Sequence, residues 1–504
     1  MSWEVNLPSA IEQALHNCFA HGDTDIFPEP HIFEHWRQFP KQAIDATLSL
    51  HKFISSNNDL PKFDCIRSFV PSGPTGFRLG TQIEPIGNLY FLALTLLCAP
   101  NLELNRQTIQ SRRVHSYRYQ PIDAECRIFQ PEFGWRSFQL QAKFNAEQFS
   151  HVVVCDIADF YRQIKPISIA NALANSDCPV SLQMRLLQVL DLLDLSVSGL
   201  PIGGPASRIL AEAVLRDVDA NFATENMTYC RFVDDIRIFS DSQQVAFEHL
   251  LLVNEILYEK GFNLQKSKTR VLNTKEWLAE SSFHAVFTPT KGNLENIEDL
   301  RKLLMLPSLD PYSEMRAQND LRLEEFARKP HALEFLKREL NKSRLHSVMA
   351  NHLLSSVQFM PALECEEAFA WLLDSRRSNK LAPLMTKILH IISKNFSKLP
   401  NPDVIQNAIE KLLFGNHYVS KISLHAAMML RILQLSKQPI NEETHKFLKI
   451  KIQESSDTLF KVEIIILLGK WNCINELLEI ECLQNVKSKF ERQALEIAKA
   501  PHAF

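Results

Sequence analysis

Two apolar, strand-like runs meet at a pair of adjacent aspartates in the stretch Tyr229-Cys-Arg-Phe-Val-Asp-Asp-Ile-Arg-Ile-Phe239. Neighbouring residues of a strand face opposite sides of a sheet, so Asp234 and Asp235 reach one site together only if they occupy the bend of a hairpin. Aspartate is also common in plain surface turns, where it hydrogen-bonds to its own backbone. The rest of the chain favours the first interpretation, a metal-binding hairpin.

Two further motifs precede this hairpin. The run His151-Val-Val-Val-Cys-Asp-Ile-Ala-Asp-Phe-Tyr161 is strand-like up to Asp156, and two aromatic residues end it. Next comes Gly199-Leu-Pro-Ile-Gly-Gly-Pro-Ala-Ser-Arg-Ile-Leu-Ala-Glu212, a glycine-rich turn with a proline placed to begin an amphipathic helix. The three motifs follow one another within about 85 residues.

This order of motifs resembles the palm of reverse transcriptases, in the elements conventionally lettered A, B, C and D. The similarity is closest to bacterial abortive-infection and defence-associated reverse transcriptases, whose motifs read D-I-x-D-F-Y and G-L-P-I-G. The resemblance implies an α+β fold: a fingers and palm unit with an antiparallel sheet and helices, followed by an all-α region of HEAT-like helical repeats.

The resemblance implies a site for two Mg²⁺ ions. Asp156 and Asp234 are expected to bridge the ions, because hard cations prefer oxygen ligands. A pair of such ions about 3.5 to 4 Å apart serves both the attacking and the leaving oxygen of a displacement. Asp235 is expected as an auxiliary ligand, and the backbone carbonyl of Ile157 as a ligand on the leaving-group side.

A lysine-bearing stretch, Gly261-Phe-Asn-Leu-Gln-Lys-Ser-Lys-Thr269, resembles motif D. Lys268 is the candidate general acid that protonates the departing pyrophosphate. Lys266 is the alternative, and a solvated loop also carries lysines without any such role.

The resemblance also assigns residues to the incoming nucleotide. Tyr161 takes the position of the bulky aromatic that lies under the sugar and excludes a 2′-hydroxyl. A core position beside the strand is the alternative and suits Phe160 better. At the glycine-rich turn the missing Cβ atoms let the backbone approach a base pair or template, and a Ser-Tyr-Arg element ending at residue 118 supplies a candidate for the triphosphate. The candidates from these two elements are Gly203, Gly204, Ser207, Arg208 and Arg118.

The composition is that of a soluble globular protein, with 45% apolar and 22% charged residues among 504. A net charge of -3 does not indicate a nucleic-acid binder, so any such surface must be local. One cluster mixes cations with aromatic rings, as single-stranded nucleic acid would require, although a solvated loop has the same composition. The cluster comprises Arg106, Arg112, Arg113, His115 and Arg118 with Tyr117 and Tyr119.

Several features indicate a cytoplasmic location. The ten cysteines occur singly without a Cys-x-x-Cys pair, which argues against zinc and against a disulfide framework. The first Lys or Arg is Arg37, so the start lacks the basic region of a signal peptide. No apolar run approaches membrane-spanning length in this interpretation, so no membrane partner is expected.

Glycine usage divides the chain. Eleven of the 13 glycines lie at or before Gly292, and the later sequence shows apolar stripes at helical spacing. These stripes run over 384–396, 404–413, 424–435, 447–452 and 460–468, and either a HEAT-like solenoid or a non-repetitive bundle fits them. The expected units are a mostly helical N-terminal and fingers region (1–145), a palm (146–290), a linker or thumb-like segment (291–320) and an α-helical repeat domain (321–504).

The resemblance implies an RNA-directed DNA polymerase that adds deoxynucleotides, acting in antiphage defence. Such enzymes copy a partner noncoding RNA or work without a template, some prime from a protein hydroxyl, and homo-oligomers are typical. The expected partners are deoxynucleoside triphosphates, RNA or DNA, and further copies of the chain. A catalytically idle palm used as a nucleic-acid-binding scaffold is one alternative, disfavoured because converging carboxylates repel one another without metal. An RNA-dependent RNA polymerase is the other, disfavoured by Tyr161. The candidate priming tyrosines are Tyr90, Tyr117, Tyr119, Tyr258, Tyr312 and Tyr418.

Overall fold

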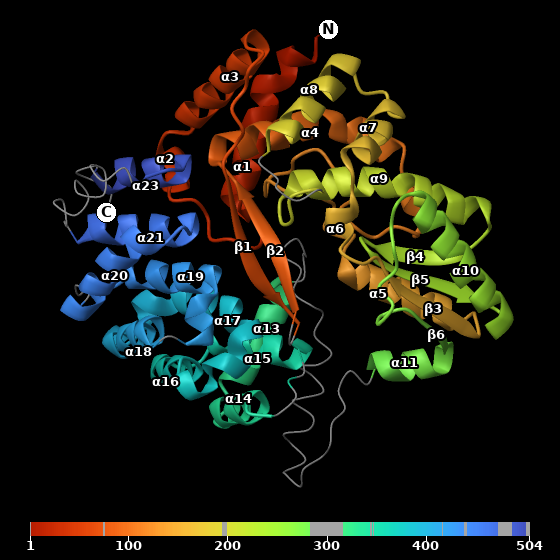
Figure 1. Ribbon diagram of the computed structural model, residues 1–504. Helices are drawn as coiled ribbons and strands as arrows, with labels where there is room; N and C mark the ends of the chain where they lie inside the picture. The colour runs from red at the N-terminus through yellow and green to blue at the C-terminus, as the bar shows by residue number, and fades with distance from the viewer. Residues whose placement is uncertain are drawn as a thin grey trace.

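The computed structural model describes residues 2–73, 76–193, 199–282, 316–342, 345, 347–415, 417–437, 441–471 and 486–499. Figure 1 shows three parts: helices of the N-terminal region at the top, a sheet with its helices at the right, and a helical C-terminal part at the lower left. The chain is therefore a mixed α+β protein with a helical C-terminal part, as the sequence predicts.

A four-stranded antiparallel sheet lies at the centre of the predicted palm. Its order is β4-β5-β3-β6. The strand β3 pairs with β5 so that Asp156 lies directly opposite Asp235, and β4 pairs with β5 as a tight hairpin. The strands are β3 (His151–Asp156), β4 (Thr228–Phe232), β5 (Asp235–Ser240) and β6 (Arg270–Asn273).

Both faces of this sheet are covered, which explains the uninterrupted apolar runs of its strands. Val153 and Cys155 of β3 belong to the core shared with α9 and α10, whereas Val152 and Val154 belong to a smaller core with α5 and α11. This alternation is the period of two that a strand imposes. The covering helices are α9 (Pro205–Thr224) and α10 (Gln243–Glu259) on one face, and α5 (Trp135–Ala146) and α11 (Thr274–Ser282) on the other.

The N-terminal region is helical, as predicted, but it also contains a β-hairpin that the sequence interpretation missed. Strands β1 (Cys65–Ser72) and β2 (Gly76–Ile83) form a separate two-stranded sheet. Pro71 lies within β1 and obscures the strand signal, because proline is tolerated only at sheet edges. The helices are α1 (Leu7–His21), α2 (Ile32–Gln38), α3 (Pro40–Ser56), α4 (Pro85–Leu104), α6 (Phe160–Gln163), α7 (Pro166–Ala174) and α8 (Val180–Leu192), with short 3₁₀ turns η1 (Trp3–Asn6) and η2 (Ile109–Ser111).

The helix α4 corrects the expectation that no apolar run reaches membrane-spanning length. Among the described residues it is one helix long and apolar enough, by length and composition, to cross a membrane. About 78% of its apolar window is buried inside the molecule, where α4 contacts α1, α3, α8 and α9. The helix is apolar all round because other helices surround it.

The C-terminal part consists of helices at the predicted stripes. Among the described helices, α13, α15, α17, α19, α21 and α23 contact one another in sequence as one row, and α14, α16, α18 and α20 as another. The predicted linker at 291–320 lies mostly outside the described residues. The helices are α13 (Arg316–Ala327), α14 (Ala332–Leu340), α15 (Ser347–Val357), α16 (Ala362–Leu372), α17 (Ser375–Asn395), α18 (Pro402–Phe414), α19 (Ser423–Leu433), α20 (Glu442–Glu454), α21 (Thr458–Lys470) and α23 (Lys489–Lys499), with 3₁₀ turns η3 (Phe396–Lys398) and η4 (Tyr418–Lys421).

The C-terminal helices are joined to the N-terminal region by apolar and polar contacts. Phe27 and Ile66 are buried in the same core as the C-terminal helices, and α17 and α19 contact β1. At the other end of this interface, Lys489 of α23 donates to Glu84 over 2.8 Å. The C-terminal part is therefore packed against the N-terminal region along the β1–β2 hairpin (Figure 1).

Candidate active site

The structure brings Asp156, Asp234 and Asp235 together at one end of the sheet. Asp156 is the last residue of β3, Asp235 opens β5, and Asp234 lies in the two-residue turn between β4 and β5. The backbone N–H of Ile157 donates to the carbonyl of Asp234 over 3.1 Å, which fixes the turn against the end of β3. The adjacent aspartates thus occupy the bend of a hairpin, the one position in which both can serve the same site.

The three carboxylates destabilise one another's charge. Burial, together with the nearby Asp235 and Asp156, raises the pKa of Asp234 to about 7. Burial also raises the pKa of Asp235, with Asp156 adding to the effect and Arg237 opposing it. A divalent cation between such carboxylates would relieve this repulsion, so the oxygen ligands fit Mg²⁺. As the side chains stand in the described part of the chain, no group of three His, Cys, Asp or Glu residues is arranged so that it could hold a metal ion.

Lys268 lies beside these carboxylates. Its ammonium donates to Asp156 Oδ2 over 2.7 Å, although about 56% of the side chain is exposed. The turn that carries it is tied to β3, because the N–H of Gln265 donates to the carbonyl of Asp156 over 2.7 Å. Lys266, the alternative, is exposed on the same turn. The structure therefore gives Lys268 the position from which a proton can reach the site.

Tyr161 lies between the carboxylates and the glycine-rich turn. Its pKa is raised by burial and by the neighbouring Tyr117. The N–H of Leu200 donates to the carbonyl of Tyr161 over 2.9 Å. Gly199 has φ +115°, and a Cβ there would lie 2.5 Å from that same carbonyl oxygen, so this close approach requires glycine.

Phe160 occupies a core position beside the strand, the alternative that the sequence analysis gave for it. It is 3% exposed, and its ring packs 5.6 Å from that of Phe262 in the core below the sheet. Its assignment to substrate binding is therefore corrected, because a ring enclosed by apolar neighbours does not reach a nucleotide.

The glycine-rich turn contacts protein where an approach to template was expected. A Cβ at Gly203 would lie 2.3 Å from Thr24 Oγ1, and the nearest atom to a Cβ at Gly204 is the carbonyl oxygen of Asp23. Ser207 is 1% exposed. Gly203 and Gly204 therefore pack against the loop after α1, which lies about 180 residues away in sequence, and Ser207 is enclosed within the protein.

Arg208 also faces this loop. Its guanidinium is 2.5 Å from Asp25 Oδ2 and lies over the ring of Tyr117 at 4.9 Å from the centroid. The side chain is 7% exposed, so Arg208 supports Tyr117 from within the protein.

Arg118 does not lie where a triphosphate would bind. It is 1% exposed, and its guanidinium donates to Glu103 Oε1 over 2.9 Å and to the carbonyl of Gln107. Arg106 is buried with the same glutamate, and burial lowers the pKa of His115 to about 4. The cation-rich segment predicted as a nucleic-acid surface is thus largely an internal ion-pair network. The acidic partners of these arginines lie outside the cluster, so the composition of the cluster gave no sign of the ion pairs.

Arg78 is the functional candidate that the sequence interpretation missed. It is exposed on β2, and its positive charge partly opposes the rise in the pKa of Asp234 that burial, Asp235 and Asp156 cause. The exposed rings of Phe69 and Phe77 on the same hairpin meet edge to face at 6.3 Å. The sequence interpretation missed Arg78 because it missed the hairpin that carries this residue.

Residues 103–291 match the model of the family Reverse transcriptase (RNA-dependent DNA polymerase). The chain therefore carries a reverse transcriptase domain, and the matched residues include all three carboxylates and Lys268. A domain of this family supports a nucleotidyltransferase activity of polymerase type. No curated protein matches the chain.

Two solved telomerase structures, both in complex with a TWJ fragment of telomeric RNA, show a distant similarity. Telomerase from Candida albicans is 11% identical with a TM-score of 0.30, over 76% of this chain and 70% of that one. Telomerase from Candida tropicalis is 12% identical with a TM-score of 0.33, over 80% of this chain and 68% of that one.

Proposed function

We propose that this protein is a DNA polymerase of reverse-transcriptase type that adds deoxynucleotides to a 3′-hydroxyl or an equivalent hydroxyl. The observation that carries the proposal is the convergence of Asp156, Asp234 and Asp235 at one end of a sheet inside a matched reverse transcriptase domain. Buried carboxylates that repel one another are costly to retain unless they bind a cation.

The three carboxylates and the carbonyl of Ile157 would hold two Mg²⁺ ions. When bound, these ions supply a lowered pKa at the attacking hydroxyl and charge stabilisation at the leaving pyrophosphate. Divalent metal use is general among reverse transcriptase domains. That two ions bind is part of the present proposal.

The protein's own side chains have separate roles in this reaction. Arg78 binds the triphosphate, because it is an exposed cation whose charge acts on Asp234. Tyr161 blocks the space under the sugar and so selects deoxynucleotides. Lys268, which donates to Asp156 in the structure, would deliver its proton to the departing pyrophosphate.

The resemblance to abortive-infection enzymes supports the wider part of the proposal. The protein acts in antiphage defence in the cytoplasm, copies a noncoding RNA or works without template, and assembles with further copies of itself. The two rows of C-terminal helices support a HEAT-like solenoid. Of the candidate priming tyrosines, Tyr258 is 77% and Tyr418 43% exposed, Tyr90 is buried against His51, and Tyr312 lies outside the described residues.

Substitution of Asp234 by Asn tests the polymerase, with Asp241→Asn as the matched control. Asp241 follows β5 on the exposed surface, so its substitution makes the same charge change away from the site. Asp234→Asn is expected to lower incorporation of labelled deoxynucleotides by roughly 100-fold or more while the control stays active. Normal incorporation by a well-folded Asp234→Asn protein would contradict the proposal, and preferential use of ribonucleotides by the wild type would favour the RNA polymerase alternative.

The remaining parts need the full-length protein in its native state. Sequencing the nucleic acid that copurifies with the protein identifies a template, if one is used. Mass spectrometry of peptides after incubation with labelled deoxynucleotides detects a DNA–peptide adduct, which protein priming requires. Light scattering measures the assembly, and a monomer at micromolar concentration would contradict the homo-oligomer.

A further inference from the structure

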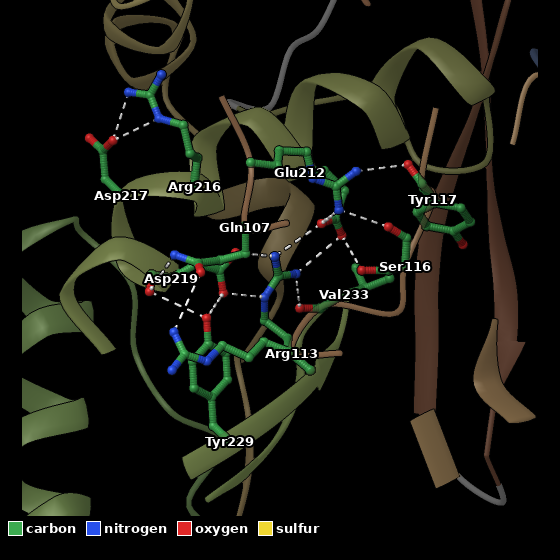
Figure 2. Close-up of polar contacts among 12 residues, drawn as sticks. Gln107, Arg113, Ser116, Tyr117, Glu212, Arg216, Asp217, Asp219, Tyr229 and Val233 are labelled. Carbon is green, nitrogen blue, oxygen red and sulfur yellow. Dashed lines mark hydrogen bonds and ion pairs between the residues drawn. The ribbon is translucent and has the colours of Figure 1, made fainter. Parts of the chain in front are cut away.

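Glu212 of α9 is a fully buried carboxylate held by two arginines. It is 1% exposed and receives Arg231 at 3.0 Å and Arg106 at 2.7 Å on the same oxygen, Oε2. Its other oxygen receives the hydroxyl of Ser116 over 2.6 Å. Figure 2 shows Glu212 gathered with Ser116, Tyr117 and Val233 in one set of polar contacts.

One of the two arginines holds the turn that presents Asp234. Arg231 Nη1 donates to the carbonyl of Val233 over 3.0 Å, and its other nitrogens reach Glu212 and Asp219. Val233 has φ +54°, in the left-handed region that β-branched residues avoid. The strained residue immediately before the catalytic pair is therefore fastened to a buried guanidinium.

The second arginine, Arg106, holds a strained residue, Tyr117, on the side of the site proposed to bind the nucleotide. Arg106 Nη1 donates to the carbonyl of Tyr117 over 3.0 Å, and Nη2 donates to that of Ser116 over 2.8 Å. Tyr117 has φ +43°, also left-handed. Its ring lies beneath Arg208 and adjoins Tyr161, the residue proposed to exclude the 2′-hydroxyl.

The network is charged and electrically balanced. Glu103, Glu212 and Asp219 face Arg106, Arg118 and Arg231, three charges of each sign. Burial alone would raise the pKa of Glu212, but Arg231 and Arg106 hold it below its ordinary value, so the carboxylate stays ionised at neutral pH. Buried ion pairs contribute little net stability compared with apolar packing, and their attested use is to fix one geometry.

We propose that Glu212 is a positioning residue that sets two strained backbone turns at once, Val233 beside the metal ligands and Tyr117 beside the sugar pocket, through Arg231 and Arg106. This role rests on the proposed polymerase function. No motif signals this role, because Glu212 lies at the seventh helical position after Pro205 and is buried within the protein.

The test compares Glu212→Gln with Asp217→Asn in the full-length protein. Asp217 lies on the same helix and pairs with Arg216 and Lys260 near the surface, so its substitution changes charge without touching the network. Binding of Mn²⁺ is followed by electron paramagnetic resonance of the free ion, with Asp234→Asn identifying the site. Glu212→Gln is expected to weaken Mn²⁺ binding roughly 10-fold, the population shift that a released left-handed residue implies. Asp217→Asn is expected to bind as the wild type does.

A second substitution separates positioning from general support. Val233→Gly accepts the left-handed conformation without strain. Added to Glu212→Gln, it is expected to restore Mn²⁺ binding to within about threefold of the wild type. Glu212→Gln is also expected to reduce the preference for dATP over ATP. This reduction should persist in the double variant, because Val233→Gly leaves the backbone at Tyr117 without its support. A merely structural role predicts the reverse, since glycine would loosen the turn further.

The possible results are distinguishable. A folded Glu212→Gln protein with wild-type Mn²⁺ affinity overturns the positioning role, as does a double variant that is not rescued. Should Glu212→Gln fail to fold, Ser116→Ala removes a single hydrogen bond to Glu212 and is expected to shift both readouts in the same direction by a smaller factor; unchanged readouts there also overturn it. If Mn²⁺ affinity changes as expected but no variant, including the wild type, incorporates nucleotides, the polymerase function is refuted. The positioning of the metal ligands by Glu212 then still holds. A wild-type protein that binds no Mn²⁺ would refute both.

Discussion

Replacing Glu463 by Gln is expected to loosen the C-terminal helices from the N-terminal region. Glu463 of α21 is 1% exposed, and its Oε1 receives Arg431 Nη2 over 2.7 Å. Its Oε2 receives Gln434 over 2.8 Å and lies 2.9 Å from His31 Nε2. Arg431 also donates to the carbonyl of Glu29, so this cluster fastens the loop before α2 to the C-terminal part.

The magnitude follows from the pKa of Glu463. Burial alone would raise it, but Arg431 and His31 outweigh burial and hold the pKa at about 2, against an ordinary 4.5. A gap of this size corresponds to about 3 kcal/mol, or roughly 300-fold in the equilibrium for local opening. Because the folded pKa is depressed, the contribution is complete above about pH 4.5 and is lost as pH falls toward 2.

Hydrogen exchange with mass spectrometry of the full-length protein measures this opening. At pH 7, peptides covering α21 and the loop before α2 should exchange about 100-fold faster or more in Glu463→Gln. Glu442→Gln is the matched control, because Glu442 is 82% exposed and its pair with Lys446 contributes little. Unchanged protection at pH 7 would refute the reasoning, as would a difference between wild type and variant that stays equally large near pH 2.5.

Three further outcomes concern the site. Tyr161→Ala is expected to admit ribonucleotides by opening space under the sugar; an unchanged deoxy-to-ribo ratio in a competition assay would place the gate elsewhere. Arg78→Gln should raise the KM for deoxynucleoside triphosphates about 10-fold with little change in kcat, since one charge-assisted contact to phosphate is lost. An unaltered KM in steady-state kinetics would show that Arg78 does not bind the triphosphate. Lys268→Ala should lower kcat by roughly 100-fold, whereas Lys266→Ala should not, as single-turnover rates would show; equal effects of the two would remove the general-acid role.

The sequence predicted the hairpin bend at Asp234 and Asp235 because that bend is local. Two adjacent aspartates between apolar runs serve one site only at a hairpin bend, and the structure has β4 end at Phe232 and β5 begin at Asp235. The apolar stripe at 424–435 likewise predicted α19, because helical spacing is a property of a single segment. The β1–β2 hairpin escaped prediction since Pro71 interrupts its alternation.

What the sequence alone determined is therefore the type of those elements whose apolar pattern is uninterrupted, and the residues at their ends. Which side chains meet across long separations was decided by tertiary structure. Arg118 and Arg231 carry the same charge. Both are enclosed by acids that come from other segments. Arg78, in a segment with no recognisable motif, acts electrostatically on Asp234. A charge reaches water or a partner according to how elements pack, and packing is a property of the whole chain.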